Sequence, residues 1–163
     1  ILWLIQHKFV ILKQNIMNTE TYISNLNQLL SSYQIHYQNL RSLHWNVKGR
    51  AFFELHLKYE ELYTRSLEII DELAERILSI GEVPLSRFSE YAKTSKIHEN
   101  EIIKDGSTGV QYILDAQLSL LEQEKEILAQ SDEKDDEGTH SLMSDLIGEK
   151  EKLNWMFKSW LEH

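Results

Sequence analysis

Residues 44–75 read HWNVKGRAFFELHLKYEELYTRSLEIIDELAE, and this stretch decides both the fold and the candidate chemistry. From about Glu54 to Ile80 it predicts one long helix. Four polar residues fall within one face of that helix, at about 0°, 40°, 60° and 100° around the axis: His56, Glu60, Asp71 and Glu75. Tyr63, Leu67 and Leu78 share the face, so the pattern differs from a solvated surface and predicts buried carboxylates that need partners.

The spacing of the four polar residues is palindromic. His56 and Glu75 are equidistant from the centre of the helix at residues 65–66, and Glu60 and Asp71 are equidistant from the same point. One helix cannot gather all four around one ion, because Glu60 and Asp71 are roughly 16 Å apart at 1.5 Å rise per residue. Two copies crossing antiparallel at residues 65–66 would set each histidine end against the other copy's acidic end. The sequence therefore predicts two equivalent sites between subunits, roughly 22 Å apart.

Composition limits the class of protein. The 163 residues fit one domain with a sizeable core, and the low glycine and proline counts, 6 and 1, favour an all-α bundle. With 17 basic and 26 acidic side chains the net charge is −9, which argues against nucleic-acid binding through the body of the protein and favours cations as partners. The absence of cysteine excludes disulfides, zinc–thiolate sites and a cysteine nucleophile, and fits a reducing compartment.

The N-terminal segment, residues 1–16, is apolar but interrupted by polar residues. It is too short and too broken to span a bilayer, and it lacks the pattern of a signal peptide. Met17 is a plausible natural start. Two interpretations stay open: residues 1–16 are upstream sequence that does not belong to the natural chain, or they are an extension that packs on a bundle formed by residues 17–163.

Apolar periodicity predicts four long helices. The first begins at a cap on Asn18 or Thr19 and ends before Gly49, the second ends at Gly81, and the third runs from Gly106 to about Gln130. The fourth extends from about Leu142 to Leu161, after an acidic linker at residues 131–138. The third helix is expected to bury a face that includes Val110, Ile113 and Leu118.

The connection between the second and third helices, residues 82–106, is long and holds one short helical piece near Ser86–Lys93. The short connection between the first two helices makes them antiparallel neighbours. Four long helices with one long middle connection match a ferritin-like four-helix bundle, in which a crossover joins helices two and three.

His44 closes the first helix and His56 opens the second, so both could face one site. Imidazole and carboxylate donors without sulfur suit iron(II), manganese or zinc, and iron(II) is the natural choice for redox chemistry. The alternative is that the acids belong to solvated helix faces and the histidines to the core. The Glu-x-x-His motif of within-chain di-iron bundles occurs only once, at Glu137 to His140 in the acidic linker, which disfavours a within-chain centre.

Three segments carry a resemblance to a known family: LHWNVKG at 43–49, FFELHLKYEELY at 52–63 and IIDELAERILSIGEVP at 69–84. In these the sequence resembles Dps-type miniferritins, the dodecameric branch of the ferritin-like superfamily. The resemblance implies a ferroxidase ligand set, both metal-binding and catalytic, of His44, His56, Glu60, Asp71 and Glu75. The first three would come from one subunit and the last two from its twofold partner, with Glu60 standing where many members have Asp.

The resemblance also implies a cytoplasmic homo-oligomer, a hollow shell of twelve subunits that stores iron(III) mineral as part of a stress response. Two irons would bind per intersubunit site and be oxidised by hydrogen peroxide or dioxygen. The alternative function is a non-enzymatic DNA-protecting nucleoid protein with the same shell, and a further one is a four-helix interaction module. Family members that compact DNA commonly use a Lys-rich N-terminal tail. Residues 1–17 of this chain contain only two lysines, Lys8 and Lys13, so DNA binding is expected to be weak or absent.

Overall fold

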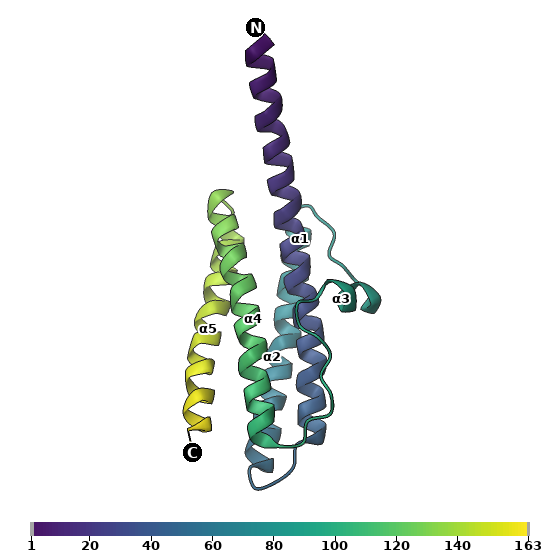
Figure 1. Ribbon diagram of the computed structural model, residues 1–163, viewed down its shortest axis with the longest axis vertical. Helices are drawn as coiled ribbons and strands as arrows, with labels where there is room; N and C mark the ends of the chain where they lie inside the picture. Colours follow the sequence, from purple (N-terminus) through teal and green to yellow (C-terminus); the bar gives the residue numbers. More distant parts are fainter. Residues whose placement is uncertain (1, 163) are drawn as a thin grey trace.

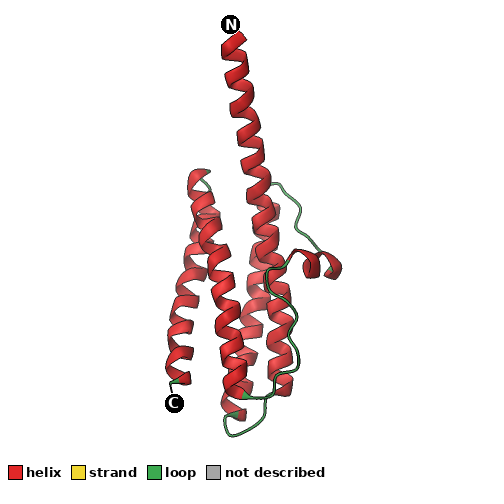
Figure 2. Cartoon of the chain, viewed as in Figure 1, coloured by secondary structure: helices red, strands yellow, loops and turns green. Residues whose placement is uncertain are grey.

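The computed structural model describes the backbone of residues 2–162 and the side chains of residues 18–162. Every regular element in this part of the chain is a helix (Figure 2). The helices are α1 (Leu2–Asn46), α2 (Phe52–Ser79), α3 (Phe88–Thr94), α4 (Gly106–Glu133) and α5 (Glu137–Leu161). The predicted all-α fold is confirmed.

The four long helices lie side by side as a bundle, and α3 sits outside it in the connection between α2 and α4 (Figure 1). The loop between α1 and α2 is short and turns at Gly49, whose φ of +105° favours glycine because it lies in the left-handed region. Gly81, with φ of +88°, ends α2 in the same way. The four-helix bundle with a short helix in its long crossover is thus as the sequence predicted.

Buried apolar side chains at helical spacing hold the bundle together. On α2 these are Leu55, Tyr59, Ile69, Ile70, Leu73 and Ile77. They pack against buried faces of α1 and α4 in two adjoining clusters, one built around Leu26, Leu29 and Leu73 and the other around Leu43, Leu55 and Ile113. This packing leaves much of the opposite face of α2 exposed, including Leu57, Leu67 and Leu78, and the candidate site lies on that face.

Three details differ from the sequence-based expectation. The first helix has no cap at Asn18 or Thr19, because α1 runs without a break from Leu2, and its N-terminal turns project past the other helices in Figure 1. How the side chains of residues 1–16 pack lies outside the described residues. The predicted acidic linker is shorter than residues 131–138, since α4 extends to Glu133 and α5 begins at Glu137 with Asp136 as its cap. Leu118, expected in the core, is 50% exposed.

No helix in the described part of the chain is long and apolar enough to cross a membrane. This agrees with the broken hydropathy of the sequence.

Asp136 joins three elements at one end of the bundle. Its carboxylate accepts hydrogen bonds from the backbone N–H and the hydroxyl of Thr139, so Asp136 caps α5. It also accepts a hydrogen bond from the Tyr22 hydroxyl of α1. It also pairs with Arg76 of α2 at 2.5 Å. Burial by itself would raise the pKa of Asp136, but the hydrogen bonds from Thr139 and Tyr22 and the charge of Arg76 together lower it.

We expect Asp136→Asn to lower the free energy of unfolding by about 1–3 kcal/mol at pH 7, because it removes the partly buried charge that pairs with Arg76, although asparagine can still cap α5. Because folding lowers this pKa, the carboxylate stabilises the folded state fully at any pH above its pKa in the unfolded chain, which is about 4. This contribution is lost as the pH falls further, toward the pKa in the folded state. The thermal midpoints of wild type and variant should therefore converge below about pH 4. Asp132→Asn, on an exposed residue nearby, serves as the control; an equal loss in both variants would contradict the role of Asp136.

Candidate metal centre

His44 in the last turn of α1 and His56 in the first turns of α2 face each other across the short loop. Their rings stack with centroids 3.8 Å apart and planes 21° from parallel. The Nδ1 of His44 lies 2.8 Å from the backbone oxygen of His56, and the Nδ1 of His56 lies 2.9 Å from the backbone oxygen of His44. The two helix ends thus fix both rings by a reciprocal pair of backbone contacts.

These contacts assign the tautomer of each imidazole. A carbonyl oxygen can only accept, so each Nδ1 must carry the proton and donate it. In a neutral ring the proton on Nδ1 leaves Nε2 with a free lone pair, which is the arrangement found in metal-binding histidines whose second nitrogen donates to an acceptor. Both histidines are therefore prepared to bind a metal ion through Nε2.

Aromatic rings surround the histidine pair. Phe52 stacks on His56 with centroids 5.1 Å apart, and the edge of Tyr63 meets His44 at 5.4 Å. The Tyr63 hydroxyl lies 3.4 Å from Oε1 of Glu60 and donates to it. Desolvation and the nearby Glu60 raise the pKa of Tyr63, so the hydroxyl keeps its proton for this contact. Tyr63 thereby links a histidine and a carboxylate of the predicted ligand set, a role that sequence reasoning did not assign to it.

The three predicted carboxylate ligands, Glu60, Asp71 and Glu75, are all exposed in the single chain. The sequence predicted that these carboxylates are buried between two copies of α2, and that burial stays a prediction. By helical rise, Asp71 and Glu75 lie roughly 22 Å along α2 from the end that carries His56 and Glu60. Among the described residues, no group of three or more His, Asp or Glu side chains is placed to hold a metal ion. One chain brings His44 and His56 together, with Glu60 one helical turn beyond His56, and places Asp71 and Glu75 toward the other end of α2.

Exposed leucines accompany these carboxylates on α2. Leu57, Leu67 and Leu78 are 59%, 52% and 57% exposed, although a long helix in a stable monomer usually turns such residues inward. We call the combined surface the α2 stripe; its members are His56, Leu57, Glu60, Leu67, Asp71, Glu75 and Leu78. An exposed apolar surface interleaved with acids is typical of an interaction face.

The family model for the ferritin-like domain matches residues 23–163, most of the chain. The chain belongs to the ferritin-like family. Within it, the chain is 39% identical over 141 residues to DNA protection during starvation protein 2 of Bacillus anthracis, a match that covers 85% of this chain and 95% of the relative. It is 36% identical over 138 residues to the DNA protection during starvation protein of Porphyromonas gingivalis, covering 85% and 87%.

Solved structures place the chain in a narrower branch of this family. It superposes on the Dps protein of Vibrio cholerae O1, described as a member of a superfamily of ferritin-like diiron-carboxylate proteins, with a TM-score of 0.86 and 46% identity over 89% of this chain and 91% of that one. For Dps of Staphylococcus aureus the TM-score is 0.84 and the identity 30%, over 87% and 95%. The resemblance to Dps-type miniferritins is thus confirmed.

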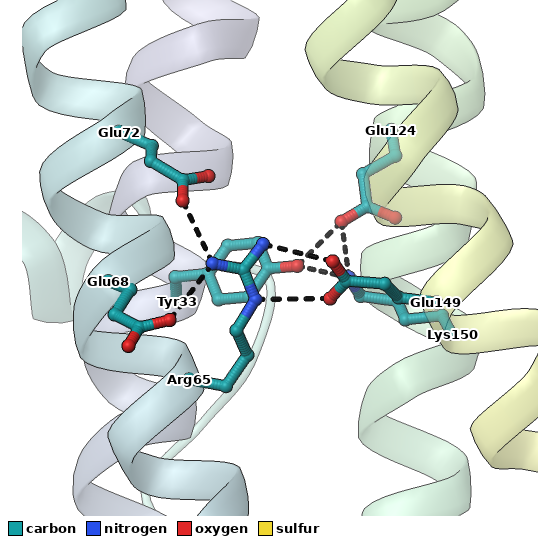
Figure 3. A network of polar contacts seen from close by, with 7 residues as sticks. All are labelled: Tyr33, Arg65, Glu68, Glu72, Glu124, Glu149 and Lys150. Atoms are coloured by element: carbon teal, nitrogen blue, oxygen red, sulfur yellow. Dashed lines mark hydrogen bonds and ion pairs between the residues drawn. The ribbon is translucent and has the colours of Figure 1, made fainter.

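The miniferritin contains a second polar cluster that the sequence did not reveal. We call it the core network: Tyr33, Arg65, Glu68, Glu72, Glu124, Glu149 and Lys150 (Figure 3). Its inner part is the ion pair between Lys150 and Glu124, 2.7 Å apart, in which Glu124 is fully buried. Burial raises the pKa of Glu124 and lowers that of Lys150, while each charge opposes the shift of the other. On their helices these residues resemble any solvated Glu and Lys, so spacing alone gave no signal.

Proposed function

We propose that this miniferritin oxidises iron(II) at sites shared by twofold-related subunits and stores the iron(III) product as mineral inside a hollow cytoplasmic shell of twelve subunits. Family membership supports iron storage and protection in general. The observation that carries the finer proposal is the histidine pair. Its free Nε2 atoms lie at one end of α2, and the exposed Asp71 and Glu75 lie toward the other end.

An antiparallel second copy of α2 would complete the site. It would bring the partner's Asp71 and Glu75 to His44, His56 and Glu60, and it would cover Leu67 near the crossing point at residues 65–66. Three carboxylates and two neutral imidazoles give each site a charge of −3, which nearly balances two iron(II) ions. Nitrogen and oxygen donors without sulfur suit that ion.

Iron is the substrate in this proposal, and hydrogen peroxide is the preferred oxidant. Each iron(II) gives up one electron and peroxide accepts two, so two irons bound at one site would reduce one peroxide to two hydroxide ions without releasing a radical. Consuming both reactants together would protect the cell against oxidative damage.

Anaerobic addition of iron(II) followed by peroxide tests the proposal. We expect rapid growth of iron(III) absorbance with two irons oxidised per peroxide, together with an assembly mass of twelve subunits. Oxidation no faster than that of free iron(II) in the same buffer would contradict the ferroxidase proposal, and a monomer would contradict the shared site.

The alternative of a non-enzymatic DNA-protecting protein predicts DNA binding. Because the net charge is −9 and affinity for DNA grows with the number of phosphates neutralised, we expect no retardation of DNA at submicromolar protein near neutral pH. A gel-shift series at two salt concentrations checks this, with a chain lacking residues 1–16 run in parallel. Salt-sensitive retardation by that shortened chain would reveal a basic surface on the bundle and favour the alternative.

A further inference from the structure

The core network brings together groups from all four long helices of the bundle. Tyr33 comes from α1, Arg65 from α2, Glu124 from α4 and Lys150 from α5 (Figure 3). Inward-facing polar groups at such a point are how helix bundles build metal sites. Here the positive charge at the centre belongs to a lysine.

Two oxygen atoms bind the Lys150 ammonium. Its Nζ lies 2.7 Å from Oε1 of Glu124, and it also donates to the hydroxyl oxygen of Tyr33. The Tyr33 hydroxyl in turn donates to the same Glu124 oxygen at 2.7 Å. Glu124 is completely buried and Lys150 is 6% exposed, so neither charge has water to stabilise it. The carboxylate therefore depends on this one cation.

Three further buried atoms that could serve as metal ligands have no hydrogen-bond partner. A cavity of about 60 Å³ is lined by His36, Gln117 and Lys150 among others. His36 Nδ1, Gln117 Oε1 and the second oxygen of Glu124 are buried without any hydrogen bond. His36 and Gln117 are each only 3% exposed. Burial and the charge of Lys150 lower the pKa of His36 to about 3, so its imidazole is neutral and keeps a lone pair.

An ion pair also lines this cavity. Arg65 Nε and Nη2 bind the two oxygens of Glu149 at 3.1 and 3.0 Å, and both residues line the cavity. Arg65 also pairs with Glu68 and Glu72 of its own helix. The pair links α2 and α5 beside the cavity that His36, Gln117 and Lys150 also line.

We propose that the bundle core contains a cation site built from Glu124, Tyr33 and His36, and that Lys150 is its resident cation and keeps divalent metal ions out. A metal ion entering beside the ammonium would meet a like charge in a medium of low dielectric, which is strongly unfavourable. With Lys150 removed, the same buried carboxylate and imidazole would need a new cation, and a divalent ion that accepts nitrogen and oxygen ligands suits them.

Zinc binding by a Lys150→Ala variant tests the proposal without any redox chemistry. The parent should carry His56→Ala and Asp71→Ala, so that zinc at the α2 stripe does not obscure the result. In equilibrium dialysis we expect the Lys150→Ala chain to bind one zinc ion more than the parent, and zinc to raise its thermal midpoint. Adding Glu124→Gln should abolish the extra ion.

Two controls separate the site from a general effect of losing a lysine. Lys125 pairs with Glu151 at 3.0 Å across the same two helices, but both side chains are more than half exposed. Lys125→Ala is expected to bind no extra zinc. Lys150→Met removes the charge but fills the space that an ion would occupy, so it too should bind none, and Glu124 would be neutralised by a proton instead.

Three results would overturn the proposal. The first is a folded Lys150→Ala chain that binds no more zinc than the parent, and the second is an extra ion that persists after Glu124→Gln. The third is a Lys150→Ala chain that fails to fold both with and without zinc, because a vacated cation site must accept a replacement. A chain that folds only when zinc is present would support the proposal. Since the measure is the difference between two chains, the result does not depend on whether the protein oxidises iron.

Discussion

Replacing His56 by alanine is expected to slow iron(II) oxidation by more than about 100-fold, because even residues that only orient a metal ligand contribute 10–100-fold. The same loss is expected for Asp71→Ala. The His44 ring should stay in place in the first variant, since its acceptor is the backbone oxygen of residue 56, which alanine retains. Asp71 is exposed in the single chain, so its removal leaves the apolar core intact.

The measurement is the initial rate of iron(III) formation, with the assembly mass recorded for each variant. Glu122→Ala, which removes an exposed acid of α4 away from the stripe, is the matched control and should oxidise iron at the wild-type rate. Should either His56→Ala or Asp71→Ala keep that rate, the residue is no ligand and belongs to an ordinary helix surface. A variant that loses both assembly and activity would point to a structural role.

Two inactive variants are expected to restore activity when they are assembled together. One variant lacks the histidines, through His44→Ala and His56→Ala, and the other lacks the acids, through Asp71→Ala and Glu75→Ala. In a mixed twofold pair, one site receives its histidines from the second variant and its acids from the first, so it is wholly native. The other site of that pair retains only Glu60.

The size of the recovery follows from counting sites. Random mixing makes half of the twofold pairs mixed, and half of their sites native, so activity should return to about one quarter of wild type. Subunits must be dissociated and reassembled, with mixing confirmed by mass. A ligand set within one chain predicts no recovery, and confirmed mixing without regained activity would defeat the shared site. The crossing point should form in both variants, because each keeps residues 65–66 and Leu67.

Sequence periodicity predicted the helices well because each long helix buries a regular apolar face. The position of α2, its end at Gly81 and the short helix in the crossover followed from spacing and from glycine. The start of α1 did not, since Asn18 and Thr19 are tolerated inside a helix as well as at its cap. Leu118 misled for a different reason: helical spacing identifies an apolar face, but not how much of that face the neighbouring helices cover.

The candidate site was predictable in part. The pairing of His44 with His56 across a short turn followed from sequence order, and the palindrome on α2 indicated a second copy; the ligand roles of Glu60, Asp71 and Glu75 stay predictions. The reciprocal backbone contacts of the histidines and the contact of Tyr63 with Glu60 could not be read from sequence, because they depend on ring orientation. The pair of Glu124 and Lys150 was also missed, since a helix gives the same spacing to buried and to solvated charges.

The histidine pair bears on the order in which the protein folds. His44 and His56 are only twelve residues apart in the chain, and contacts of such short range close early because little chain entropy is lost in forming the loop. The hairpin of α1 and α2 can therefore set both imidazoles before α4 and α5 dock across the long crossover. In the proposed shared site, the partner's acids would arrive only when another subunit associates, a concentration-dependent step. A freshly synthesised chain would thus carry half a site, and its capacity to react with iron would appear only as subunits associate.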